Sequence, residues 1–95
     1  MATGFILQFE NTNIASYEAT TKELGLRSGS NENWPAGIIS HTAGESGTTL
    51  CVVDIWESEA AFGKYREERL GPALVKTGMP TPKVTKFEVH NRFPQ

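Results

Sequence analysis

The stretch TTLCVVDIW, residues 48–56, is the clearest strand in the sequence and decides its predicted fold. Its residues are mostly β-branched or otherwise apolar, which favours a strand. Successive side chains of a strand point to opposite faces of a sheet, so the apolar residues here form two sets. One set is Leu50, Val52 and Trp56, and the other is Cys51, Val53 and Ile55. This strand therefore needs apolar neighbours on both faces of its sheet.

Hydrophobic periodicity and capping residues place six further elements around this strand. A period of two marks strands, helical spacing marks helices, and turn residues mark their ends. The predicted elements are a strand at 5–10, a helix at 14–24, a strand at 36–43, a helix that begins after Ser58, a short extra helix at 72–77 and a strand at 83–90. Gly44–Gly47 is the predicted hairpin turn, and Gly71–Pro72 is predicted to interrupt the second main helix.

The order strand, helix, strand, strand, helix, strand is typical of the ferredoxin-like βαββαβ fold of the α+β class. Its compact arrangement is a four-stranded antiparallel sheet with both main helices on one face. Residues 1–95 are enough for one such domain, so a single domain is expected. The two helices cover only one face, which leaves the second apolar set of residues 48–56 without a partner.

A homodimer packed sheet to sheet would cover this second set. Soluble monomers rarely expose a contiguous apolar patch, and two-fold pairing is the commonest way to bury one. The alternative is a monomer whose outer face is only mildly apolar. We therefore expect a homodimer.

Composition excludes several kinds of partner. The net charge of −2 gives no long-range attraction for nucleic acid or for an anionic membrane surface. No apolar stretch approaches the ~20 residues that span a bilayer, and the N-terminus resembles no secretory signal. We therefore expect a cytoplasmic protein that binds neither nucleic acid nor membrane. The single cysteine, Cys51, cannot form an intrachain disulfide, and no phosphate-binding glycine loop is present, so no metal or other cofactor is expected.

The candidate site residues lie on the predicted third strand and its neighbours. His41 is a possible pocket base or ligand anchor, because histidine changes charge near neutral pH, or else a structural histidine. Asp54 either lines a pocket or bonds to nearby backbone. Trp56 is a core residue or a pocket wall, Trp34 a lid or a simple cover, and the Tyr65 hydroxyl could reach the same cavity.

The predicted hairpin turn also predicts a register. If Gly44 opposes Gly47, then Gly37 opposes Asp54, and His41 lies four residues from Gly37 on the same face. At ~3.3 Å per residue this separates His41 from Asp54 by roughly 13 Å. The sequence therefore predicts that His41, if functional, acts alone rather than in a dyad with Asp54.

Three segments carry a resemblance to a known family. They are GIISHTA at 37–43, VVDIWESEAAF at 52–62 and FEVHN at 87–91. With them the chain resembles the antibiotic biosynthesis monooxygenase-like proteins of the dimeric α+β barrel superfamily. The resemblance implies a homodimer with a pocket between sheet and helices. Some members of the family oxidise polycyclic aromatic phenols or quinols without metal or flavin, and others degrade haem, or isomerise or cyclise small molecules.

The resemblance also separates the branches of the family. The haem-degrading branch places an Asn on the first strand and a His on the second helix, and neither is found at those places here, so haem degradation is disfavoured. Trp56 matches the strand-end tryptophan of the oxygenase branch, and Tyr65 is a candidate for its helix phenol.

Two functions remain open. The first is a cofactor-free oxygenase, isomerase or cyclase that acts on a small aromatic or polyketide-like molecule. In it His41 or Asp54 takes a proton while Trp56 and Phe62 hold the ring by stacking. The second is a non-catalytic dimeric module that binds a small molecule or only supports assembly. An open pocket lined by His41, Asp54, Trp56 and Tyr65 would favour the first, and a space filled by side chains the second.

Overall fold

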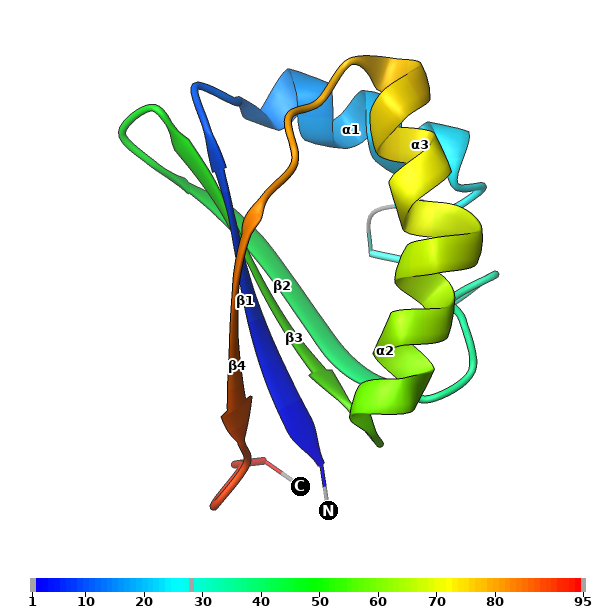
Figure 1. Ribbon diagram of the computed structural model, residues 1–95, viewed down its shortest axis with the longest axis vertical. Coiled ribbons are helices and arrows are strands. Elements are labelled where there is room, and N and C mark those ends of the chain that lie inside the picture. Colours follow the sequence, from blue (N-terminus) through cyan, green and yellow to red (C-terminus); the bar gives the residue numbers. More distant parts are fainter. Residues whose placement is uncertain (1, 28, 95) are drawn as a thin grey trace.

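The computed structural model describes residues 2–27 and 29–94 and has the predicted ferredoxin-like fold. Its elements are β1 (Thr3–Glu10), α1 (Ile14–Glu23), β2 (Ile38–Ser46), β3 (Thr49–Trp56), α2 (Glu59–Tyr65), η1 (Arg66–Leu70), α3 (Gly71–Thr77) and β4 (Lys83–Glu88). The strands form one antiparallel sheet in the order β2-β3-β1-β4. Figure 1 shows all the helices on one face of this sheet and no element on the other. No helix in the described part of the chain is long and apolar enough to cross a membrane.

The core lies between this helix-covered face and the helices. Phe5, Leu7 and Phe9 of β1 alternate toward it, as do Leu50, Val52 and Trp56 of β3. Phe62, Tyr65 and Leu74 fill it from the helical side. The predicted division of β3 into two apolar sets is therefore confirmed, because its first set is buried and Val53 of the second set is 38% exposed.

The hairpin between β2 and β3 differs from the prediction. Ser46 pairs with Thr49, so the turn consists of residues 47 and 48 rather than lying between Gly44 and Gly47. Gly47 has φ +60°, which the first position of a tight two-residue turn favours and which glycine adopts without strain. Gly44 instead lies within β2, opposite Cys51.

A bulge near the start of β2 also departs from regular pairing. Ile38 pairs with Trp56 and Ser40 pairs with Ile55, so Ile39 is an extra residue on β2. The preceding Gly37 has φ +94°, and its carbonyl accepts the backbone N–H of Glu57 at 2.7 Å. The bulge keeps Ile38 on the same face as the core residues of β3.

The second helical segment is continuous where a break was predicted. The elements α2, η1 and α3 follow one another without a gap, and Figure 1 shows them as one curved rod. The η1 turn is π-helical: the N–H of Gly71 bonds to the carbonyl of Arg66, five residues earlier. Proline lacks an N–H and so disturbs a helical ladder. The wider π turn lies directly before Pro72 and lets the helix continue through it, so the predicted interruption at Gly71–Pro72 is wrong.

The outer face of the sheet is apolar and is covered by no described part of the chain. Val53 and Phe87 are each more than a third exposed there. Phe87 pairs with Gly4 across β1 and β4, and its ring lies over the space that a side chain at Gly4 would occupy. The apolar outer face that the sequence predicted is therefore present.

Candidate functional site

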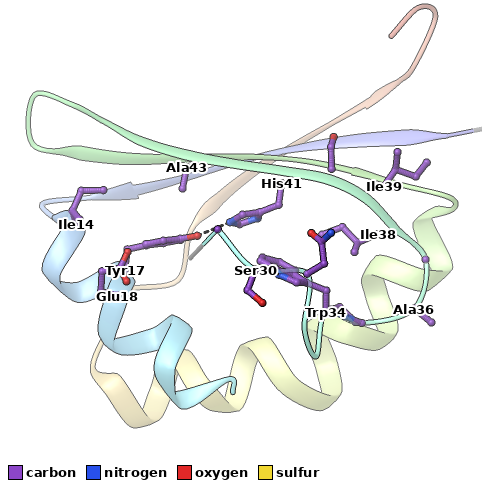
Figure 2. Close-up of a pocket in the computed structure, with 15 residues that line it drawn as sticks. Ile14, Tyr17, Glu18, Ser30, Trp34, Ala36, Ile38, Ile39, His41 and Ala43 are labelled. Carbon is purple, nitrogen blue, oxygen red and sulfur yellow. Dashed lines mark hydrogen bonds between the residues drawn. The ribbon is translucent and has the colours of Figure 1, made fainter. Parts of the chain in front are cut away.

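Four side chains form a continuous row of hydrogen bonds on the helix-facing side of the sheet. The hydroxyl of Tyr17 on α1 lies 2.6 Å from Nε2 of His41 on β2. Nδ1 of His41 lies 2.6 Å from Oδ1 of Asp54 on β3, and Nε1 of Trp56 donates to Oδ2 of Asp54 at 3.3 Å. Figure 2 shows the Tyr17 and His41 side chains reaching toward each other from α1 and β2. We call Tyr17, His41, Asp54 and Trp56 the polar row.

Local structure explains these positions. The side chain of Asn13 caps α1 by accepting the N–H of Ser16 at 3.0 Å, and Tyr17 follows one turn after the cap. His41 and Asp54 are direct cross-strand partners, so their side chains project side by side from the same face. The prediction that His41 and Asp54 are too far apart for a dyad is wrong. The hairpin turn is at residues 47 and 48 rather than between Gly44 and Gly47, and this register pairs His41 directly with Asp54.

The hydrogen-bonding groups assign a direction to the polar row. An indole N–H can only donate, and a carboxylate can only accept. Asp54 therefore accepts from Trp56 and, through its other oxygen, from Nδ1 of His41. When the imidazole is neutral with its proton on Nδ1, Nε2 accepts a hydrogen bond from the hydroxyl of Tyr17.

Burial increases along the row from His41 to Asp54. The side chain of His41 is 19% exposed, whereas that of Asp54 is 5% exposed. The indole of Trp34 lies against the imidazole, with ring centroids 4.7 Å apart, and its Nε1 donates to the carbonyl of Ser30. Burial raises the pKa of Tyr17, so this residue is a neutral phenol at pH 7. His41 thus has a buried carboxylate on one side and a neutral phenol on the other.

An open hollow of about 860 Å³ lies beside Tyr17 and His41 of the row. Its walls come from α1, from residues 29–37 and from the edge strand β2 (Figure 2). Tyr17, Trp34 and His41 contribute aromatic and polar atoms to it, and Ile38 and Ile39 contribute apolar ones. In the described part of the chain, no Lys or Arg side chain lines this hollow.

A much smaller inner cavity, of about 50 Å³, lies between the sheet and the helices. Tyr17, Trp34 and His41 border both spaces and so separate them. Asp54 and Tyr65 also line the inner cavity, and most of its other lining residues are apolar. Burial raises the pKa of Tyr65 to about 12, so its hydroxyl remains protonated well above neutral pH.

The residues that the sequence singled out divide into three groups. His41 and Trp34 line the hollow, and Asp54 lies behind His41. Tyr65 faces the inner cavity. Trp56 and Phe62 are core residues: they are 0% and 3% exposed, and their rings contact each other with centroids 5.7 Å apart. Within the described residues, neither of these two rings lines the hollow.

Sequence reasoning missed the role of Tyr17. Tyr17 lies within the predicted helix at 14–24, and nothing in the sequence marked it as part of a site. The register of the hairpin was the information needed, because the correct pairing brings His41 beside Asp54 and leaves Nε2 directed at α1.

Comparison with known proteins supports the fold. No family model matches the chain, and no curated protein matches its sequence. SnoaB from Streptomyces nogalater, described as a cofactor-independent oxygenase, is 12% identical over 99% of this chain and 98% of that one, with a TM-score of 0.68. Rv0793 from Mycobacterium tuberculosis is 15% identical over 98% and 99%, with a TM-score of 0.72.

A candidate antibiotic biosynthesis monooxygenase from Caulobacter crescentus CB15 is also similar, with 15% identity over 95% of this chain and 91% of that one and a TM-score of 0.69. At these identities the similarity concerns the arrangement of the backbone and not the residues of the site. The chain therefore has the fold of the antibiotic biosynthesis monooxygenase-like proteins, as its sequence resemblance implied.

Proposed function

We propose that this protein is a cofactor-independent enzyme that removes a proton from a small aromatic substrate held in the hollow. The observation that carries the proposal is the 2.6 Å contact between His41 and the buried carboxylate of Asp54 at the wall of an open space. A carboxylate that accepts from Nδ1 holds the imidazole in one tautomer and stabilises the imidazolium that forms when Nε2 takes a proton. General-base catalysis of this kind contributes ~10²–10⁴-fold to a rate.

The reaction type follows from what a proton acceptor can do without a cofactor. Removal of a proton from a phenol or from the enol of an aromatic ketone leaves an electron-rich anion. That anion can react with dissolved dioxygen. Oxidation of a ring CH₂ group to a carbonyl consumes one dioxygen and releases one water, so it needs no external reductant. SnoaB, with the same fold, is described as a cofactor-independent oxygenase, which supports oxygenation over isomerisation or cyclisation.

The lining of the hollow supports an aromatic substrate without negative charge. A volume of about 860 Å³ lies within the range of small-molecule sites, ~300–1,000 Å³. Trp34 offers an aromatic face, and Ile38 and Ile39 offer apolar contact. The lining described by the structure has no cationic side chain that would bind a phosphate or carboxylate. In this proposal Trp34, rather than Trp56 or Phe62, holds the ring.

A second candidate is a non-catalytic module that binds a small molecule. The space beside Trp56 and Phe62 is filled by the core, where Phe62 stacks on Phe5 with centroids 4.0 Å apart. Both ring nitrogens of His41 also have partners within the chain. A side-chain-filled interior was the feature expected of such a module.

The proposal includes a homodimer formed through the outer face of the sheet. Val53 and Phe87 expose apolar surface on that face and have no cover within the described chain. Pairing of two such faces would remove this surface from water, at roughly 25 cal/mol per Å² of apolar area. His41 is the direct partner of Asp54, and Val53 points to the opposite face, so pairing through the outer face leaves the polar row on the other side of the sheet.

Aerobic turnover of 1,8-dihydroxyanthrone, an uncharged tricyclic phenol whose CH₂ and carbonyl groups interconvert with an enol, tests the proposal. Oxygen consumption and the visible absorbance of the quinone product report the rate above the uncatalysed background. His41→Ala should lower this rate about 10²–10⁴-fold. His90→Ala, which removes the exposed second histidine, is the matched control and should leave the rate unchanged. Equal rates for wild type and His41→Ala, or no rate above background, would favour the non-catalytic module.

A further inference from the structure

His41 has no free ring nitrogen to offer a substrate. Nδ1 faces Asp54 at 2.6 Å, and Nε2 faces the hydroxyl of Tyr17 at 2.6 Å. Both distances are at the short end of the hydrogen-bond range. Tyr17 therefore occupies the position from which a substrate proton would reach Nε2. Tyr17 itself lines the hollow, where a substrate would lie.

We propose that Tyr17 is a catalytic residue, whose hydroxyl oxygen receives the substrate proton while its own proton passes to Nε2 of His41. This inference rests on the proposed function, since it names the group that touches the substrate in that reaction. It replaces a direct transfer to His41 by a relay of two protons.

The relay balances without any further reactant. The substrate O–H bond breaks and a bond forms between that proton and the oxygen of Tyr17. The former O–H bond of Tyr17 breaks, and its proton forms an N–H bond at Nε2 of His41. The products are a substrate anion, a neutral Tyr17 and an imidazolium beside the carboxylate of Asp54. No electron pair leaves the substrate oxygen in this step.

The surroundings of Tyr17 favour a relay over a mechanism in which Tyr17 is already a phenolate before the substrate binds. Burial raises the pKa of Tyr17, which disfavours a charged phenolate in this position. In the relay Tyr17 is neutral before and after the transfer, and the positive charge appears on His41, 2.6 Å from Asp54. A phenol oxygen also has lone pairs left to accept a substrate O–H while its proton is directed at Nε2.

The geometry holds Tyr17 in position for this transfer. Its ring lies nearly parallel to that of His41, at 14° and with centroids 6.0 Å apart. The backbone carbonyl of Tyr17 accepts the hydroxyl of Thr21 at 2.9 Å, and the backbone N–H of Tyr17 bonds to Asn13. The competing role is a plug, in which Tyr17 only covers Nε2 and moves aside when substrate enters.

Tyr17→Phe separates the two roles, because phenylalanine fills the same space but cannot carry a proton. With 1,8-dihydroxyanthrone as the probe, the relay predicts a fall in kcat of about 10²-fold or more with little change in KM. A plug predicts an unchanged or higher kcat. In mixtures of H₂O and D₂O, the wild-type rate should depend on the fraction of D₂O along a curve, because two protons move in one step. The residual rate of Tyr17→Phe should depend on this fraction linearly, because only one proton moves.

The controls separate failure of the relay from failure of the proposed function. An unaltered kcat in Tyr17→Phe together with a loss in His41→Ala overturns the relay and leaves His41 as the direct base. If kcat falls in Tyr17→Phe but the rates of wild type and variant both depend linearly on the fraction of D₂O, Tyr17 is a positioning residue. This result also overturns the relay. Unaltered rates in both variants overturn the proposed function.

A measurement on the resting protein needs neither substrate nor variant. The ¹⁵N chemical shifts of His41 should show a protonated Nδ1 and an unprotonated Nε2. A proton on Nε2 would mean that His41 donates to Tyr17, and the relay in the stated direction would then be excluded.

Discussion

Replacing Asp54 by asparagine should change the tautomer of His41 while leaving the fold in place. Asp54 accepts two N–H groups, one from His41 at 2.6 Å and one from Trp56 at 3.3 Å. An amide of the same shape has one oxygen and one NH₂ group, so its oxygen can accept from only one of them. Since the indole can only donate, the oxygen should face Trp56 and the NH₂ group should face His41. The imidazole must then accept at Nδ1 and carry its proton on Nε2.

The expected magnitudes differ for stability and for activity. The Asp54→Asn side chain keeps a partner for each buried donor, and the loss of charge-assisted hydrogen bonds is offset by the relief of burying a carboxylate. The net change in the free energy of unfolding should therefore be within about 1–2 kcal/mol. A proton on Nε2 prevents that atom from taking another, so turnover should fall about 10²–10⁴-fold, which corresponds to about 3–5 kcal/mol of activation free energy.

The assay is a ¹⁵N shift measurement on His41 in wild type and in Asp54→Asn, with urea unfolding of both. Asp54→Ala is the contrasting variant, because it removes both acceptors. It leaves two buried N–H donors without partners, at about 1–3 kcal/mol each. The reasoning is refuted if Nδ1 of His41 stays protonated in Asp54→Asn, or if Asp54→Asn is destabilised as much as Asp54→Ala.

Three further outcomes follow from the fold. Val53→Glu, on the outer face, should convert the dimer into a monomer in sedimentation at micromolar concentration, because an unpaired charge is costly to bury. Val75→Glu, on the exposed side of α3, is the control and should remain a dimer. A wild-type monomer would contradict the dimer. Burial raises the pKa of Tyr65 from 10.0 to about 12, so its stabilising contribution is complete below pH 10 and is lost as the pH rises to 12. Across this window the free energy of unfolding of Tyr65→Phe, measured in urea, should fall by up to about 3 kcal/mol less than that of wild type. Equal losses in the two proteins would count against this prediction. Gly37→Ala should lower the free energy of unfolding by about 1–3 kcal/mol, because Gly37 has φ +94° and the new Cβ would lie 2.8 Å from a side chain of α2. Gly44→Ala should be nearly neutral, because its Cβ would meet no described atom within 4 Å. Similar values for the two variants would refute this prediction.

The sequence was sufficient for the order of the strands and main helices and for the division of β3 into two faces. These depend on local periodicity and capping, which act within a few residues. The register of the β2–β3 hairpin was not predictable in the same way, because Gly44 and Gly47 both suit a turn. The choice depends on which of them adopts the positive φ of a tight turn, and the structure has this at Gly47.

The error in register preserved the faces and changed the neighbours. Moving the turn shifted the partner of Asp54 from Gly37 to His41, which is a shift of four residues. Because side chains alternate with a period of two, an even shift leaves His41 on the same face as Asp54. His41 and Asp54 were therefore correctly assigned to one face but wrongly separated. Tyr17 could not be added to the site, because its contact with His41 joins residues 24 apart and depends on how α1 packs on the sheet.

The central claim is that His41 and Asp54 act as one proton-accepting unit. A double-mutant cycle on the turnover of 1,8-dihydroxyanthrone tests it most directly, with His41→Ala, Asp54→Asn and the double variant compared with wild type. If Asp54 acts only through His41, the double variant should be no slower than His41→Ala alone. If the two losses multiply instead, the residues act independently and the proposed dyad is contradicted.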